Sequence, residues 1–299
     1  MHALFSLLAL SCLVFFSLIG CEQSQSVESD EAHLAPQESA IVPSTLIIRL
    51  GETGEAFQKR NPSGVRVNRQ PAGVDFYGLD WDRAPYASVR FVQGNHSFEF
   101  HHVNGVQTSE DREAFKEEGF TEWTVHALLD PAQELSHTEA EARIHKLLRA
   151  AMDAGWRQYV DGGDPRLRGQ DRLNLVLHGS TWLGLDVRHE PSLQDRVKIP
   201  DRTPWKLCVE GAFMELSFTR QALPTSDASK AVYLMTFNIK SKNEYLRAGV
   251  ESDQLPKWRE VLPAVLTQAA AQRAEEERVL RERGIEIDEG YVDPACARL

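Results

Sequence analysis

The sequence contains few cysteines and fewer basic than acidic residues. Only 4 of its 299 residues are cysteine, and no Cys-x-x-Cys motif occurs. This excludes a disulfide-rich scaffold and a zinc ribbon. The 33 Lys and Arg face 44 Asp and Glu, giving a formal net charge of −11. That balance argues against a nucleic-acid partner, because phosphates require clustered basic side chains.

The sequence also lacks the common catalytic motifs. GxSxG, GxGxxG, a Walker loop and HExxH are all absent. We therefore predict no catalytic residue, no metal and no cofactor, and favour a protein that is not an enzyme. Hydrophobic residues make up 42% of the chain, which is enough for a substantial folded core.

Charge is missing altogether from residues 3–20 (ALFSLLALSCLVFFSLIG). At ~1.5 Å per residue this run spans ~27 Å, just enough for one membrane helix, and it equally suits the apolar part of a secretory signal. Its end, Leu18-Ile19-Gly20-Cys21, resembles the lipobox of bacterial lipoproteins. Unlike most such signals, the start carries no Lys or Arg.

The lipobox resemblance implies that residues 1–20 are a signal peptide and that Cys21 becomes the acylated first residue. Two or three acyl chains hold a protein firmly on a membrane, whereas one is marginal. The resemblance therefore implies a periplasmic, lipid-anchored protein whose first partner is the membrane. Among such lipoproteins, Glu22 after Cys21 resembles the default context for sorting to the outer membrane, so the resemblance implies that membrane over the inner one.

Residues 21–43 have the composition of a disordered tether. They contain five acids, no Lys or Arg and no aromatic residue. Such a segment cannot bury enough apolar surface to offset its chain entropy. The five tether acids leave 39 acids against 33 basic residues in the rest of the chain, a net charge of −6.

The first half of the remaining chain reads as strands with two helices. We predict a strand over 44–50, a helix over 55–60 capped by Thr53, a hairpin of strands 88–93 and 97–103, and a strand over 122–129. A strong helix follows from Ser136 to Gly155, with Thr138 as the better N-cap. Its apolar stripe contains Ala140, Ile144, Leu147, Leu148 and Ala151.

The second half repeats this order. Strands are predicted over 173–178, 182–188, 205–209, 212–219 and 231–240. A long helix over 255–283 follows, and Pro263 indicates either two abutting helices or one kinked helix. Its last turns are charged on nearly every side, which favours projection into solvent or contact with a partner.

This order predicts an α+β fold of two modules, 44–160 and 161–299, each a mainly antiparallel sheet packed against a helix. The opening unit, a strand followed by Leu50-Gly51-x-Thr53, a helix and Asn61-Pro62, faintly resembles small periplasmic lipoprotein domains of the BamE/SmpA type. That resemblance covers about 18 residues, and no function is carried over from it.

The segment 74–86 (VDFYGLDWDRAPY) mixes aromatic and acidic residues. Such mixtures suit a carbohydrate- or protein-binding surface. We therefore name Asp75, Tyr77 and Trp81 as the candidate recognition surface, against the alternative that the aromatics fill the core.

Three further clusters are more simply structural than chemical. His96, Glu99 and His101 could share a metal, but amphipathic surface residues explain them as well. The pair Asp161 and Asp164 lacks the spacing of a calcium loop and suits a tight turn.

His178 beside Ser180 lacks any sign of an oxyanion hole, so catalysis there is not expected.

Cys208 and Cys296 are the thiols that remain once Cys12 is cleaved off and Cys21 is acylated. Two interpretations stay open. In an oxidising compartment they could pair and pin the C-terminal tail to a strand. Alternatively, Cys208 is a buried small hydrophobe and Cys296 is free.

Three classes of function remain. The first is a non-enzymatic module that binds a protein of unknown identity, for instance as an inhibitor or immunity factor against a toxic enzyme. The second is an accessory factor of envelope assembly. The third is a hydrolase without a recognisable motif.

Overall fold

The computed structural model describes residues 45–131, 134–223, 227 and 229–298. The predicted signal peptide, Cys21 and the tether lie outside these residues. The described chain has an α+β fold, as predicted, with helices packed on one large and mostly antiparallel sheet. None of the described helices is long and apolar enough to cross a membrane.

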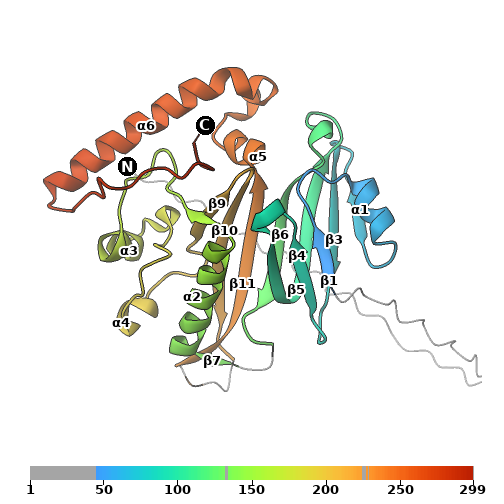
Figure 1. The fold of residues 1–299 in the computed structure, drawn as a ribbon, viewed down its shortest axis with the longest axis horizontal. Helices are drawn as coiled ribbons and strands as arrows, with labels where there is room; N and C mark the ends of the chain where they lie inside the picture. The colour runs from blue at the N-terminus through green and yellow to red at the C-terminus, as the bar shows by residue number, and fades with distance from the viewer. Residues whose placement is uncertain (1–44, 132–133, 224–226, 228, 299) are drawn as a thin grey trace, which may run out of the picture. The chain divides into compact units, whose positions relative to one another are not determined.

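The sheet is continuous from one half of the chain to the other, in the order β1-β4-β5-β6-β11-β10-β9-β8 (Figure 1). In addition, β2 and β3 extend from β5, and β7 pairs with β11. Only β1 and β4 among these ladders run parallel. The strands are β1 (Thr45–Ile48), β2 (Arg66–Arg69), β3 (Val74–Asp80), β4 (Ala87–Phe91), β5 (Phe98–Asp111), β6 (Phe120–Leu128), β7 (Leu135–Ser136), β8 (Arg157–Gln158), β9 (Trp205–Val209), β10 (Ala212–Gln221) and β11 (Lys230–Ser241).

This continuity does not confirm the predicted division into two modules. The predicted boundary at residue 160 separates β6 from β11, yet these strands pair antiparallel from Leu128↔Leu234 to Glu122↔Lys240. Every second residue is buried from Trp123 to Ala127 in β6 and from Ala231 to Ile239 in β11, and both strands contribute to the same core. Joining them covers two edges that would otherwise expose unpaired backbone groups.

The helices are α1 (Gly54–Arg60), α2 (His137–Asp153), α3 (Gly169–Leu177), α4 (Leu193–Arg196), α5 (Lys242–Arg247) and α6 (Trp258–Glu282). Short 3-10 turns are η1 (Gly94–His96), η2 (Lys116–Glu118), η3 (Thr181–Leu183) and η4 (Ser252–Lys257). Helix α2 lies along the face of β10 and β11, and α6 passes the other end of these strands (Figure 1).

Several sequence predictions are confirmed. Helix α1 begins after Thr53, whose side chain accepts the Ala56 N–H. The hairpin of β4 and β5 is connected through η1, with Phe91 opposite Phe98. The apolar stripe of α2 is buried at Ala140, Ile144, Leu148 and Ala151.

Other local predictions are wrong. Residues 173–178 form most of α3 rather than a strand, because Leu173 and Val176 are buried at helical spacing. Residues 182–188 form part of η3 and a loop. The N-cap of α2 is Ser136 and not Thr138, since Ser136 and Glu139 form a capping box.

Helix α6 is continuous through Pro263 and follows η4 directly. Its charged end does not simply project into solvent. Glu277 and Leu280 are both buried, and Glu277 holds Arg166 at 2.6 Å. One of the charged side chains in these last turns, Glu277, is therefore paired inside the chain, while others such as Glu275 and Arg278 are exposed.

Candidate functional site

A narrow cavity lies between α2, α3, the loop containing α4, and the faces of β9, β10 and β11. Its volume is about 30 Å³, enough for about two water molecules. The walls are mainly apolar, and a few polar groups converge on them, a combination typical of ligand sites. The lining residues are His137, Glu141, Ile144, His145, Gly169, Leu173, Leu185, Asp186, His189, Pro191, Arg196, Ile199, Trp205, Phe218, Arg220 and Tyr233.

Helix α2 supplies the polar wall through a second stripe beside its apolar one. His137, Glu141 and His145 are four residues apart, which places them on one face of the helix. Arg149 extends this row and lies 3.6 Å from Glu190. The four-residue spacing is the signal in the sequence from which this stripe could have been predicted.

Glu141 and Arg196 form an ion pair across the cavity wall through Oε2 and Nη2. Their side chains are only 14% and 18% exposed. The same Nη2 donates to the Pro191 carbonyl at 3.0 Å within the α4 loop, and the ion pair ties this loop to α2. Two opposite charges are thus held side by side beneath the protein surface.

His145 is buried beside this pair, with Nε2 3.6 Å from Glu141 Oε1. Loss of hydration lowers the pKa of His145, while Glu190 raises it and Arg149 lowers it. Burial is the largest of these effects, so the imidazole is neutral near pH 7.

Three polar atoms of the lining are buried and have no hydrogen-bond partner within the described chain. They are Glu141 Oε1, His189 Nε2 and Arg196 Nε. Unsatisfied buried groups are uncommon in folded proteins and each calls for an explanation. Here they belong to residues that line one cavity, where ordered water or a polar group of a ligand can satisfy them.

Another polar contact closes the far end of the cavity. His137 Nδ1 lies 2.6 Å from the hydroxyl of Tyr233 on β11. This bond fixes the first turn of α2 on the sheet and orients the Tyr233 ring along the wall. Burial raises the pKa of Tyr233, so its hydroxyl stays protonated.

The cavity adjoins a wider and more open groove, which we call the tail groove. The groove has a volume of about 820 Å³ and shares Gly169, Asp186 and His189 with the cavity. Arginines line it together with acids and apolar residues of the C-terminal tail. The lining is Arg157, Gln158, Val160, Leu167, Arg168, Gly169, Gln170, Asp171, Asp186, Arg188, His189, Asp288, Gly290, Tyr291, Val292 and Pro294.

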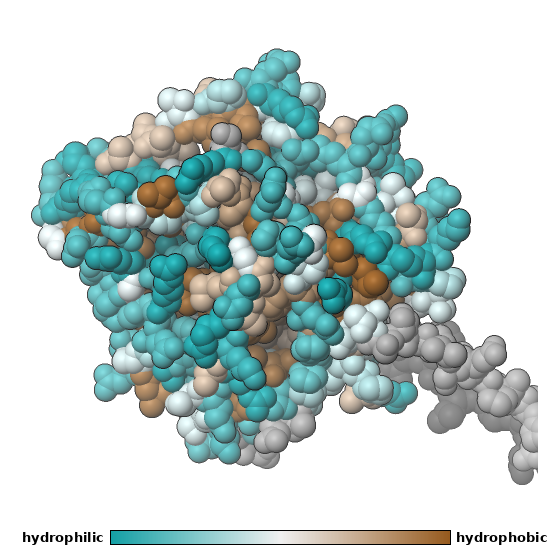
Figure 2. Space-filling view, viewed as in Figure 1, coloured by the Kyte–Doolittle hydropathy of each residue, from teal (hydrophilic) through white to brown (hydrophobic). Residues whose placement is uncertain are grey.

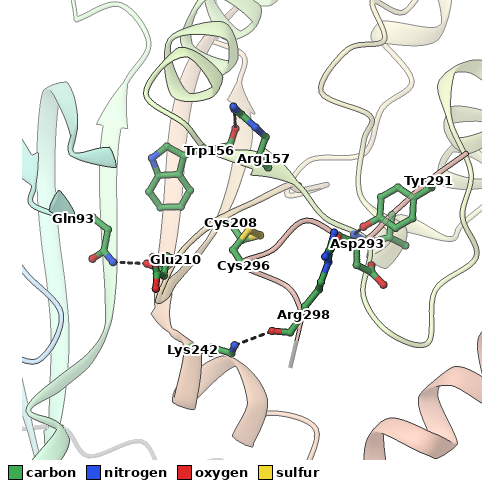
Figure 3. Close-up of a disulfide and its surroundings, with 11 residues drawn as sticks. Gln93, Trp156, Arg157, Cys208, Glu210, Lys242, Tyr291, Asp293, Cys296 and Arg298 are labelled. Carbon is green, nitrogen blue, oxygen red and sulfur yellow. Dashed lines mark hydrogen bonds between the residues drawn. A yellow bond between two sulfur atoms is a disulfide. The ribbon is translucent and has the colours of Figure 1, made fainter. Parts of the chain in front are cut away.

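The tail that forms one groove wall is fastened at several points. Asp288 N–H donates to the Arg166 carbonyl at 2.8 Å, and the Tyr291 hydroxyl accepts the Val160 N–H at 2.8 Å. Beyond them, Cys296 forms a disulfide with Cys208 of β9 (Figure 3). The groove wall therefore depends on long-range contacts.

The predicted recognition residues do not form one exposed surface. Asp75 and Tyr77 are only 2% and 4% exposed, and Trp81 packs partly buried against the core. The cause is strand alternation in β3, which turns residues 75 and 77 inward and leaves Phe76 49% exposed. Asp75 instead pairs with Arg112 at 3.0 Å.

Tyr77 supports the core rather than a binding surface. Its ring packs 5.1 Å from that of Phe120, and its hydroxyl donates to Glu110 at 3.3 Å. Burial, together with Glu110, raises the pKa of Tyr77 to about 12. The alternative that these aromatics fill the core therefore describes Tyr77 better.

The histidine cluster does not form a metal site. His96 Nδ1 lies 2.9 Å from the Ala154 carbonyl, while His101 contacts Ser88 at 3.2 Å and Glu99 at 3.8 Å. Across the described residues, no group of three or more His, Cys, Asp or Glu side chains could hold a metal ion. The neighbouring His102 is exposed, and its backbone has a positive φ of 55°, which interrupts the alternation of the strand.

The other two clusters are structural. Asp161 and Asp164 surround the buried ammonium group of Lys206, and Asp161 accepts the Tyr245 hydroxyl at 2.5 Å. His178 Nδ1 lies 2.6 Å from the Asn174 carbonyl at the end of α3.

The outer face of this region offers little continuous apolar surface. Figure 2 shows hydrophobic residues in patches between hydrophilic ones on this face. Recognition would therefore depend on a concave site more than on a flat apolar patch.

No protein-family model, no curated protein and no solved structure matches the chain.

Proposed function

We propose that this chain is a lipid-anchored periplasmic protein that binds a protein partner without catalysing a reaction. The binding site would be the tail groove together with the cavity beside it. One observation carries the proposal: a groove of about 820 Å³ shares its wall with a cavity at which three buried polar atoms converge.

The lining favours recognition over covalent chemistry. Among the described residues around the cavity there is no serine, threonine or cysteine to act as a nucleophile. The groove combines arginines with the exposed Val292 and with Pro294 and Tyr291. Arginine and aromatic residues are enriched at protein interfaces.

The location proposed from the lipobox has independent support. A disulfide joins Cys208 to Cys296. Disulfides persist in the bacterial periplasm and are rare in a reducing cytosol. An acylated Cys21 would place the groove at a membrane, with the outer membrane favoured by Glu22.

A site-specific photo-cross-linker tests the proposed surface. Placed at Val292, which is 70% exposed in the groove, it should capture a discrete partner in intact cells. The matched control is the same cross-linker at Phe76, which is 49% exposed on β3. Equal yields of the same product from both positions would contradict the proposal.

The identity of the captured partner distinguishes an immunity factor from an accessory factor of envelope assembly. A toxic enzyme captured from Val292 and inhibited by the purified chain would assign an immunity function. Envelope-assembly machinery captured there would assign an accessory function instead.

A second function is favoured by one observation, the neutral His145 beside Glu141. This pair could act in general acid–base hydrolysis on a substrate held in the cavity. The hydrolase proposal predicts an activity that is lost in His145→Gln. An activity unchanged by that substitution would place any catalysis elsewhere.

A further inference from the structure

We propose that the partner inserts a side-chain carboxamide, that of asparagine or glutamine, into the cavity beside α2. This inference rests on the proposed function, since it names the group that the binding site receives. Three properties of the cavity support it: the charges of its lining, its unsatisfied polar atoms and its volume.

The charges of the lining favour a neutral ligand group. Its side chains that carry a formal charge are two acids, Glu141 and Asp186, and two arginines, Arg196 and Arg220. Their formal charges cancel. An anionic ligand group would therefore be repelled by Glu141, and a cationic one would be repelled by Arg196. Neither would gain a net electrostatic attraction in the cavity.

To satisfy these atoms, a ligand must supply both a hydrogen-bond acceptor and a hydrogen-bond donor. Arg196 Nε–H can only donate, and the ionised Glu141 Oε1 can only accept. These atoms belong to side chains already joined through Nη2 and Oε2, so they lie close together. A carboxamide carries an acceptor oxygen and a donor nitrogen on one carbon, which matches this arrangement.

The remaining walls and the volume agree with such a group. A cavity of about 30 Å³ has room for about two water-sized groups, which the oxygen and the nitrogen of a carboxamide would occupy, and Ile144, Leu173 and Ile199 line the walls beside them. The partner's main chain would then lie in the tail groove, which shares His189 with the cavity.

Propionamide, which reproduces the glutamine side chain, tests the inference directly. We would record isoleucine-methyl NMR spectra of the full chain in detergent during a titration. Ile144 and Ile199 line the cavity, and Ile48 and Ile239 lie elsewhere in the core. Saturable shifts confined to Ile144 and Ile199 are expected, with a Kd of about 1–10 mM for so small a ligand.

Isosteric probes determine the chemistry that is recognised. Propionate and propylammonium should bind at least tenfold more weakly than propionamide. Absence of saturable shifts with propionamide, or equal binding of propionate, would overturn the inference. Binding of N-acetylglucosamine without propionamide would also overturn it, in favour of an amino-sugar ligand.

The double substitution Glu141→Met with Arg196→Met removes the donor and the acceptor without leaving a buried charge. It should abolish saturable binding of propionamide. The control Glu275→Met with Arg278→Met removes an exposed pair on α6 and should bind as the wild type does. If the Val292 cross-link persists while propionamide fails to bind the wild type, the proposed function stands and this inference alone is rejected.

Discussion

The Glu277 carboxylate of α6 clamps Arg166 through three hydrogen bonds. It accepts from Arg166 Nε at 2.7 Å, from Nη2 at 2.6 Å and from the backbone N–H at 3.0 Å. Glu277 is 3% exposed, so these bonds are made largely out of water. The contact holds the long helix against the loop that leads into the tail groove.

Removing this carboxylate should destabilise the fold. Glu277→Ala leaves Arg166 without its buried partner, which typically costs about 3 kcal/mol. The free energy of unfolding from urea denaturation measures the loss. Glu275→Ala, which removes an exposed ion pair of the same helix, is the control and should change little. An equal effect of both substitutions would contradict the importance of the clamp.

His145 should make stability depend on pH. Burial lowers its pKa in the folded state, so the unfolded chain binds its proton more readily. The stabilisation is therefore present above the ordinary histidine pKa of about 6.5 and is lost as the pH falls through the lowered value.

Urea denaturation at pH 7.5 and at pH 5.5 measures this effect. His145→Gln should lessen the decrease in the free energy of unfolding between the two pH values. His178→Gln, at an exposed position, should leave the decrease as it is in the wild type. A decrease unchanged in His145→Gln would contradict the assignment.

The disulfide should protect the groove wall. Cys296→Ser opens a loop of 88 residue steps and should lower the free energy of unfolding by about 2–4 kcal/mol. Chymotrypsin should then cleave faster at Tyr291, whose hydroxyl holds the Val160 N–H.

The control for this experiment is alkylation of the unfolded wild-type chain. Without reductant, neither Cys208 nor Cys296 should react with iodoacetamide. Modification of both residues would show that the bridge is absent in the protein.

Asp75 should affect stability and not recognition. Asp75→Ala leaves Arg69 and Arg112 facing each other without their shared carboxylate, at a cost of about 2 kcal/mol. Cross-linking from Val292 should persist under conditions where the variant is folded. Asp82→Ala, at an exposed position nearby, should leave the free energy of unfolding almost unchanged. Loss of the cross-link in folded Asp75→Ala would restore β3 as the recognition surface.

Local features of the fold could be predicted because nearby residues decide them. The α+β class, the β9 to β11 strands, α1 and the apolar stripe of α2 follow from period and capping. The same local patterns misassigned residues 173–178 (LNLVLH), because a run in which four of six residues are apolar suits a helix as well as a strand. A short apolar run does not distinguish the two structures.

The candidate site could be predicted only in part. The row His137, Glu141 and His145 is visible as a four-residue spacing, but its importance depends on Arg196 and His189, which come from a loop about 50 residues away. The prediction at Asp75 and Tyr77 failed for a related reason. The alternation of side chains in a strand predicts that residues 75 and 77 share one face of β3. Which face is buried depends on how the rest of the chain packs against the sheet.

The amino-acid sequence alone determined the α+β class, the acidic balance and most of the strands and helices, because these depend on composition and on contacts within a few residues. The tertiary structure alone decided that β6 pairs with β11 in one sheet, that Asp75 and Tyr77 face inward, and that Glu141 and Arg196 meet beside a cavity. These outcomes depend on which distant segments bury each other's apolar faces, and local propensity carries no information about that choice.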